Sequence, residues 1–276
     1  MHEQGAYVLE TLGLQGKTAI VTGAGRGLGK AMAKSLAQAG AQVVCAARTQ
    51  EQIDGTVSEI TSDGGQAIAV QTDVTSSAQI DALVAACIEQ YGQLDIMIAN
   101  AGGGVSSDHE FWEFEDEEFE AVLGLNLKSA FYSGRAASKV MVERGEGGVI
   151  INVASGTALR GNRGFAYPTA KGGVISLTKS EATILWPHNI RANVIVPGYV
   201  SQGPAKDDEE ANLRQNRGGF IPVRRLGEWW ELGPLAVYLA SDASQYVTGE
   251  QFIIDGAGLA GGIGPTGYAP RHELDA

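Results

Sequence analysis

Short apolar runs alternate with longer helical patterns between residues 17 and 255. Seven runs are rich in β-branched residues, and several are apolar at consecutive positions, as is typical of strands covered on both faces. They span residues 18–21, 42–46, 67–70, 94–98, 148–152, 192–196 and 251–254. The segments between them, such as 28–38 and 80–91, are long enough for right-handed crossover helices. The pattern predicts an α/β fold, a doubly wound, seven-stranded parallel sheet of the Rossmann type in a single domain.

Three segments depart from this alternation. Residues 1–13 precede the first run and are interpreted as an N-terminal arm. Residues 199–219 are charged and flanked by glycine, and a loop of this length in a compact domain is typical of a substrate lid. Residues 256–276 form a tail that is too rich in Gly and Pro for us to expect a helix of its own.

The composition excludes several classes of function. The net charge is −12 and the pI about 4.8, so nucleic acid and anionic membrane surfaces are poor partners. No apolar run reaches the roughly 18 residues of a spanning helix, and residues 1–14 carry no signal pattern, so a cytoplasmic protein is expected. Cys45 and Cys87 are interpreted as small core residues. The four histidines are scattered, and no metal site is expected.

A glycine-rich turn follows the first run and opens a helical pattern. In that context glycines let the backbone approach a pyrophosphate, whose charge the helix N-terminus favours. A mononucleotide P-loop is excluded, because Ala24 and Ala31 stand where that motif needs glycine and serine or threonine. The turn therefore predicts a dinucleotide site. Its residues are Gly23, Arg26, Gly27, Leu28 and Gly29.

The end of the second run indicates which dinucleotide is bound. An acidic residue there would bind a ribose 2′-hydroxyl and repel a 2′-phosphate. This chain has Arg48 at that point, and Arg26 lies inside the glycine turn. Two guanidinium groups favour NADP(H), with NAD(H) left possible.

A tyrosine and a lysine are the candidate reacting groups. Tyr167 and Lys171 are four residues apart and share one face of a helix. A lysine cation near a phenol is expected to lower the pKa of the phenol toward the working range. Ser155 lies twelve residues upstream of the tyrosine.

Together these residues resemble the short-chain dehydrogenase/reductase family, over residues 14 to about 258. The glycine turn matches the family's T-G-x-x-x-G-x-G motif, and Asn100-Ala101-Gly102 matches its N-A-G motif. The family's catalytic residues map onto Asn126, Ser155, Tyr167 and Lys171. The resemblance adds further cofactor contacts at Asp73 and Val74, which would lie by the adenine, and at Pro197, Gly198 and Val200, beside the nicotinamide.

The resemblance implies hydride transfer between a nicotinamide and a carbonyl or secondary alcohol. Tyr167 would be the general acid and base, and Ser155 would hold the substrate oxygen by a hydrogen bond. Lys171 would lower the pKa of the tyrosine and, with it, contact the cofactor by binding the nicotinamide ribose. Asn126 would hold a water that links Lys171 to solvent.

The chain departs from the family pattern at three points. Pro168 follows the tyrosine, which a helix tolerates only in its first turn. The threonine often found shortly after the Pro-Gly pair is absent, which puts the contact between lid and cofactor phosphates in doubt. The chain also continues beyond Gly256, where many members end.

The family further implies self-association through two long helices, to a dimer or a homotetramer. One of these helices is expected over residues 119–143, with apolar side chains for the contact. They are Val122, Leu123, Leu127, Phe131 and Val140. Because the last strand of such proteins ends near a subunit interface, the tail is expected to cross a neighbouring subunit, with a frayed terminus as the alternative.

Several functions fit these features. The leading interpretation is an NADP(H)-dependent alcohol dehydrogenase or ketone reductase acting on a small molecule. A 3-oxoacyl-carrier-protein reductase would need a basic docking patch, for which Arg135, Lys139 and Arg144 are candidates. A sugar or polyol dehydrogenase is a further alternative, as is a dinucleotide-sensing protein without catalysis, although the latter would be expected to lose Tyr167 or Lys171.

Overall fold

The computed structural model describes residues 8–104, 110–160 and 164–261, and these form one parallel sheet with helices on both faces. The sheet has seven strands in the order β3-β2-β1-β4-β5-β6-β7, and every neighbouring pair is parallel. The strands are β1 (Thr18–Thr22), β2 (Gln42–Ala47), β3 (Gln66–Gln71), β4 (Ile96–Ala99), β5 (Gly148–Val153), β6 (Ile190–Pro197) and β7 (Gln251–Ile254). The predicted fold and all seven predicted strands are confirmed.

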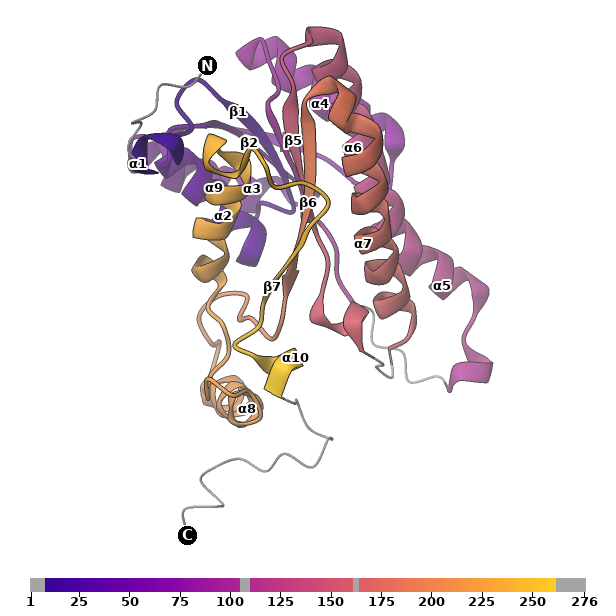
Figure 1. Cartoon of the computed structure of the whole chain (residues 1–276). Coiled ribbons are helices and arrows are strands. Elements are labelled where there is room, and N and C mark those ends of the chain that lie inside the picture. Colours follow the sequence, from indigo (N-terminus) through magenta and orange to yellow (C-terminus); the bar gives the residue numbers. More distant parts are fainter. Residues whose placement is uncertain (1–7, 105–109, 161–163, 262–276) are drawn as a thin grey trace.

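The helices lie in two layers, with α2, α3 and α9 over one face of the sheet and α4, α6 and α7 over the other (Figure 1). Their bounds are α2 (Gly27–Gln38), α3 (Gln50–Ser62), α4 (Ser77–Tyr91), α6 (Ser129–Arg144), α7 (Ala166–Leu185) and α9 (Gly233–Ala240). Shorter helices are α1 (Val8–Thr11), α5 (Asp116–Leu123), α8 (Asp208–Gly219) and α10 (Gly258–Gly261). The strand order reverses between β1 and β4, and ligands of such sheets bind at the carboxyl ends of the strands beside that point.

The burial of the strands explains why their sequences do not alternate. Every residue of β1, β4 and β6 is buried, because helices cover both sides of the sheet. The edge strand β7 instead alternates between exposed and half-buried positions. Cys45 and Cys87 are both buried and unpaired, in core clusters on opposite faces, as predicted.

The predicted helix over 119–143 is present but is not regular. A π-helical turn, Gly124–Lys128, separates α5 from α6, and Asn126 lies within it. A π turn inserts one residue into a helix and is often found at functional sites. Helical periodicity alone carries no signal for it.

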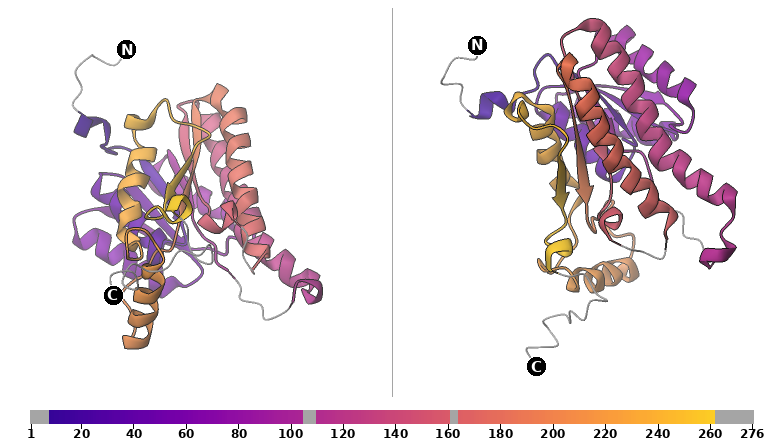
Figure 2. Two further views of the ribbon diagram at one scale, coloured as in Figure 1. Left: turned by 60° about the horizontal axis from the view of Figure 1, so that its bottom comes forward. Right: turned by 45° about the vertical axis from the view of Figure 1, so that its right-hand side comes forward.

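The expected lid contains a helix rather than an irregular loop. Helix α8 begins after Asp207, whose side chain accepts a hydrogen bond of 2.8 Å from the backbone N–H of Glu210. The first turn of α8 is acidic, and negative charge there is stabilised by the positive end of the helix dipole. The acidic residues that the sequence analysis placed in a loop therefore start a helix. Figure 2 shows α8 beyond the carboxyl ends of the strands, on the side where β7 ends.

The tail also corrects a prediction. Residues 258–261 form the short helix α10, whose Leu259 N–H donates to the Asp255 carboxylate at 2.7 Å. The rest of the tail, 262–276, and most of the N-terminal arm, 1–7, lie outside the described residues.

Candidate active site

The glycine turn after β1 is shaped by close contacts between backbones. Gly23 has a φ of +69°, in the region that favours glycine. A Cβ on Gly29 would collide with the carbonyl oxygen of Gly23 and with the side-chain amide of Asn100. Asn100 itself donates to the carbonyl of Thr22 at 2.9 Å, which ties the loop after β4 to this turn. Glycine at Gly27 and Gly29 therefore opens α2 with little side-chain bulk, which lets a bound phosphate approach its first N–H groups.

A cleft of about 660 Å³ runs from this turn to Tyr167 and Lys171. It is bordered by the predicted residues Gly23, Arg26, Leu28, Gly29, Arg48, Val74, Asn100, Ala101, Gly102, Ser155, Tyr167, Lys171, Pro197, Gly198 and Val200. Of the predicted site residues, Gly27, Asp73 and Asn126 do not border the cleft. The structure thus brings residues from seven separate loops and helix starts to one place.

The charged side chains that border the cleft are all basic. Arg26, Arg48 and Lys171 border it, and the described residues around it include no Asp or Glu. Asp73 lies between the two bordering residues Thr72 and Val74, and its carboxylate accepts hydrogen bonds from the Thr75 N–H at 3.0 Å and from the Thr75 hydroxyl at 2.8 Å. The Thr75 N–H, its hydroxyl and the nearby Arg48 charge lower the pKa of Asp73.

The Ser155 hydroxyl is near enough to Tyr167 to lower the pKa of the phenol, as expected of two candidate catalytic residues. Ser155 caps a 3₁₀ turn directly after β5, and Tyr167 lies in the first turn of α7. Pro168 is also in that first turn, where its missing N–H costs no helical hydrogen bond. The helix therefore tolerates a proline directly after the tyrosine.

The pKa of Tyr167 is raised, so its net shift runs opposite to the lowering expected from the sequence. Burial of the phenol raises its pKa, and the hydrogen bond with Ser155 opposes this only in part. The Lys171 Nζ lies 5.8 Å from the centre of the tyrosine ring and donates to the Val153 carbonyl at 2.8 Å. Burial lowers the pKa of Lys171 itself to about 8.

Asn126 clamps the loop after β4. Its Oδ1 accepts from the Gly103 N–H at 3.0 Å, while its Nδ2 donates to the carbonyls of Gly103 and Val122, each at 3.0 Å. A Cβ on Gly102 would lie 2.6 Å from this Oδ1 and 2.9 Å from the Nζ of Lys171. Asn126 is therefore near Lys171, but its amide is engaged with backbone, a positioning task that the sequence did not predict.

Gln202 is a cleft residue that sequence reasoning missed. Its side chain reaches Gly27, where a Cβ would collide with it, and it borders the same cleft. It stands near the place of the absent threonine, so the lid does contact the phosphate-binding turn. Other cleft residues missed from the sequence are Gln52, Thr72, Leu125 and Gly103. They follow no local motif, because tertiary packing alone places them there.

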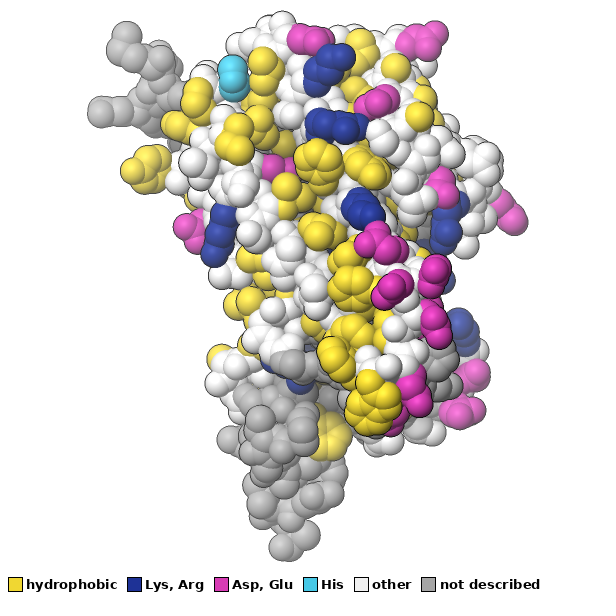
Figure 3. Space-filling model, turned by 90° about the vertical axis from the view of Figure 1, so that its right-hand side faces the viewer, with side chains coloured by type: hydrophobic (Ala, Val, Ile, Leu, Met, Phe, Trp, Pro, Cys, Tyr) yellow, Lys and Arg dark blue, Asp and Glu magenta, His cyan; other side chains and the backbone are white. Residues whose placement is uncertain are grey.

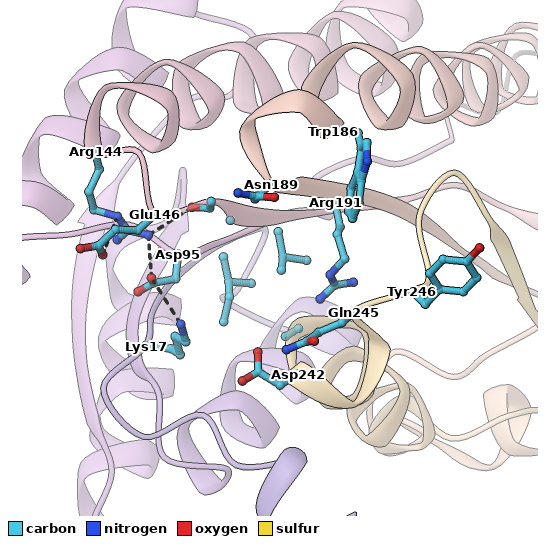
Figure 4. Close-up of a pocket in the computed structure, with 15 residues that line it drawn as sticks. Lys17, Asp95, Arg144, Glu146, Trp186, Asn189, Arg191, Asp242, Gln245 and Tyr246 are labelled. Atoms are coloured by element: carbon cyan, nitrogen blue, oxygen red, sulfur yellow. Dashed lines mark hydrogen bonds and ion pairs between the residues drawn. The ribbon is translucent and has the colours of Figure 1, made fainter. Parts of the chain in front are cut away.

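A second cavity, of about 480 Å³, lies at the amino ends of the strands (Figure 4). Asp95 is its central carboxylate: it accepts from the Thr18 N–H at 2.8 Å and from Arg144 Nη2 at 2.8 Å, and Lys17 lies 4.0 Å away. Arg191 donates to the carbonyl of Leu239 at 2.8 Å. These contacts tie together strand beginnings and helix ends, and this cavity contains none of the candidate catalytic residues.

Two further observations concern the part of the chain that the structure describes. No three His, Cys, Asp or Glu side chains come together there as a metal site would need. None of its helices combines the length and apolar character required to cross a bilayer.

Known proteins are similar to this chain in both sequence and fold. A family model described as Enoyl-(Acyl carrier protein) reductase matches residues 23–259. A short-chain type dehydrogenase/reductase from Mycobacterium marinum superposes with a TM-score of 0.85 at 36% identity, over 91% of this chain and 98% of the other. The chain belongs to the short-chain dehydrogenase/reductase family.

Curated members of the family with similar sequences are oxidoreductases. An L-rhamnose 1-dehydrogenase (NAD(P)(+)) of Azotobacter vinelandii is 38% identical, over 87% of this chain and 95% of its own length. A 3-oxoacyl-[acyl-carrier-protein] reductase of Synechocystis is 35% identical, over 88% and 97% respectively. This short-chain dehydrogenase/reductase is thus a nicotinamide-dependent enzyme that transfers hydride between its cofactor and a CH–OH or C=O group.

Proposed function

We propose that the chain is an NADP(H)-dependent dehydrogenase of a small secondary alcohol, or reductase of the matching ketone. The preference for NADP(H) rests on the charge of the cleft. Three cationic side chains border the cleft, and the described residues that border it include no carboxylate. The protein as a whole has a net charge of −12, so this local positive charge runs against the global trend. A guanidinium such as that of Arg48 binds a phosphate monoester through charge-assisted hydrogen bonds.

The shape of the site fits a dinucleotide. Gly23, Gly27 and Gly29 would leave room for the pyrophosphate, and a Cβ on any of these glycines would meet backbone or side chain. Arg26 and Arg48 would hold the 2′-phosphate, while Pro197 and Gly198 would border the nicotinamide. Asp73 and Val74 remain the proposed neighbours of the adenine.

The side chains at the other end of the cleft supply the acid–base chemistry. The bound nicotinamide supplies or accepts the hydride. Tyr167 donates a proton to the substrate oxygen in the reductive direction, and its raised pKa keeps the phenol protonated at neutral pH. Ser155 donates a hydrogen bond to the same oxygen, which stabilises the negative charge that develops there.

Lys171 and Asn126 act on the geometry of this site. With a pKa of about 8, Lys171 is still largely a cation at pH 7 and would bind the ribose hydroxyls. Its hydrogen bond to Val153 fixes α7 against the end of β5. Asn126 holds the Gly103 segment beside it, and the proposed water relay would use the backbone of that segment rather than the occupied amide.

Initial rates with NADPH and NADH test this cofactor choice. The unmodified enzyme is expected to have a higher kcat/KM with NADPH, by about 10-fold or more. Arg48→Asp should reverse the preference, because a carboxylate repels the 2′-phosphate, and Arg48→Lys should keep it in weakened form. A preference of the unmodified enzyme for NADH would contradict the proposal.

A small molecule is favoured over an acyl carrier protein as substrate. Of the three candidate docking residues, Arg144 pairs with Asp95 at the opposite edge of the sheet. Arg135 donates to the Ser77 hydroxyl and lies over the Phe131 ring. Arg144 and Arg135 are thus each engaged within the subunit, and Arg144 lines the cavity at the amino ends of the strands, away from the catalytic residues.

We further propose a homotetramer located in the cytoplasm, where thiols such as Cys45 and Cys87 stay reduced. Of the five apolar side chains suggested for the contact, Val122, Leu123, Leu127 and Val140 pack inside the subunit, and Phe131 is 44% exposed. Other apolar side chains are exposed along the face of α6 and α7 (Figure 3), among them Ile184 of α7 at 68% exposure. Trp186, in the 3₁₀ turn that follows α7, is 48% exposed. The molar mass measured by light scattering should be four times the 28.8 kDa mass of one chain.

A further inference from the structure

A small cavity of about 100 Å³ adjoins the cofactor cleft at the catalytic serine. The two cavities share Ser155, Pro197 and Gly198. The other residues around the small cavity are Gly156, Thr157, Arg160, Tyr199, Asp255 and Leu259. Because Ser155 holds the reacting oxygen in the proposed function, substrate atoms next to the reacting carbon can extend into this cavity.

Arg160 is the cation of this cavity. It follows the 3₁₀ turn that Ser155 caps, so only the four residues of that turn separate Ser155 from Arg160. Its Nη2 donates to the Tyr199 hydroxyl at 3.2 Å, and its Cζ lies 5.8 Å from the centre of the Tyr199 ring. Within the described residues Arg160 forms no ion pair, so most of its N–H donors are open to a ligand.

Asp255 is the one acidic residue that lines the same cavity. It makes no ion pair with Arg160, and its Oδ2 accepts the Leu259 N–H at 2.7 Å. Its carboxylate therefore helps to close the cavity by starting α10, and it remains an acceptor for a hydroxyl group. The cavity thus offers a cation and a hydrogen-bond acceptor at separate points.

We propose that Arg160 binds a carboxylate of the substrate, so that the substrate class is a short hydroxy acid or the matching oxo acid. This inference rests on the proposed function, because it extends the same catalytic site. A guanidinium matches a carboxylate with two parallel hydrogen bonds, which a neutral hydroxymethyl group cannot form. A phosphate would bring almost two negative charges against one guanidinium beside Asp255, and the single charge of a carboxylate matches better.

Binding of D-gluconate and D-glucitol to the NADP⁺-saturated enzyme tests the assignment. These two probes differ in one terminal group, a carboxylate against a hydroxymethyl group. Calorimetric titration should show gluconate binding with a Kd about 10-fold or more below that of glucitol, as expected for a charge-assisted bidentate contact. Arg160→Gln should abolish this ratio, and Arg160→Lys should retain part of it.

Arg217→Gln is the matched control, because Arg217 is an exposed arginine of α8 that borders none of the cavities described above. This variant should keep the full ratio, which separates local recognition from a general change of charge. Equal binding of the two probes, binding of neither, or a ratio that survives Arg160→Gln would each overturn the inference. Reduction of 5-dehydro-D-gluconate and L-sorbose then separates the two proposals: binding of gluconate without any hydride transfer overturns the function alone.

Discussion

The Thr157 hydroxyl donates a hydrogen bond of 3.0 Å to the Oγ of Ser155, and the Thr157 backbone N–H donates a second one of 3.3 Å. A hydroxyl has two acceptor positions and one proton. With both acceptor positions of Ser155 taken, its own proton is directed to Tyr167 or to a substrate oxygen. Thr157 is therefore a positioning residue for the serine.

Thr157→Val should lower kcat by about 10-fold with little change in KM, since it removes one of the two donors that orient Ser155. Thr157→Ser keeps the hydroxyl and should retain most of the activity. Steady-state kinetics of the two variants checks this. Equal losses in both would mean that the overall packing of the threonine side chain, rather than its hydrogen bond, orients the serine.

Tyr167→Phe should lower kcat by about 100-fold or more, because it removes the proton donor. Cofactor affinity, measured by fluorescence titration with NADPH, should change little, because the ring remains in place. A purified variant that keeps most of its activity would assign the proton to another group.

Asn126→Ala should raise the KM for the cofactor and lower kcat together, because it releases the Gly103 segment from two hydrogen bonds. A side chain that acted only in a water relay would lower kcat and leave cofactor affinity intact. The two parameters, measured separately, distinguish these roles. Asn126→Asp is a matched variant that keeps the acceptor for the Gly103 N–H and loses the donor.

Glu181 makes the stability of the fold depend on pH. Its carboxylate accepts from Asn152 at 2.7 Å, and burial raises its pKa from 4.5 to about 7. The folded state thus holds a proton that the unfolded state loses between pH 4.5 and 7, so stability falls as pH rises through that window. Above pH 7 the buried Glu181 carboxylate lowers the free energy of unfolding by its full amount, up to roughly 3 kcal/mol.

Glu181→Gln should therefore raise Tm by several degrees at pH 8 and leave it nearly unchanged at pH 4.5. Thermal unfolding at both pH values checks this sign. Glu250→Gln, a change at an exposed position, is the control and should show no such difference. A gain of the same size at both pH values would trace the effect to packing rather than to protonation.

Elements that depend on local sequence could be predicted, whereas those that depend on distant contacts could not. The strands follow from consecutive apolar residues, and the glycine turn from its position between a strand and a helix. The π turn at Asn126 and the reach of Gln202 to Gly27 need contacts between separate loops, for which one sequence carries no signal. Helix α8 was different: Asp207 and the three acidic residues after it are a recognisable helix start, and that signal was overlooked.

The direction of the Tyr167 pKa shift also needed the structure. A spacing of four residues predicts that Tyr167 and Lys171 are near each other, but it says nothing of how deeply either is buried. Burial is the largest cause of the shift at both groups, and at each it acts in the direction that disfavours charge.

The reversal of strand order between β1 and β4 bears on how such a protein can diverge. The loops that leave these two strands turn to opposite faces of the sheet, so the space between them exists because of connectivity and not because of any one side chain. If Arg48 and Arg160 have the proposed roles, replacing either one should change which molecule is accepted without placing the fold at risk. The chain can acquire a new specificity through single replacements at the rim, while the frame that holds the reacting groups stays the same.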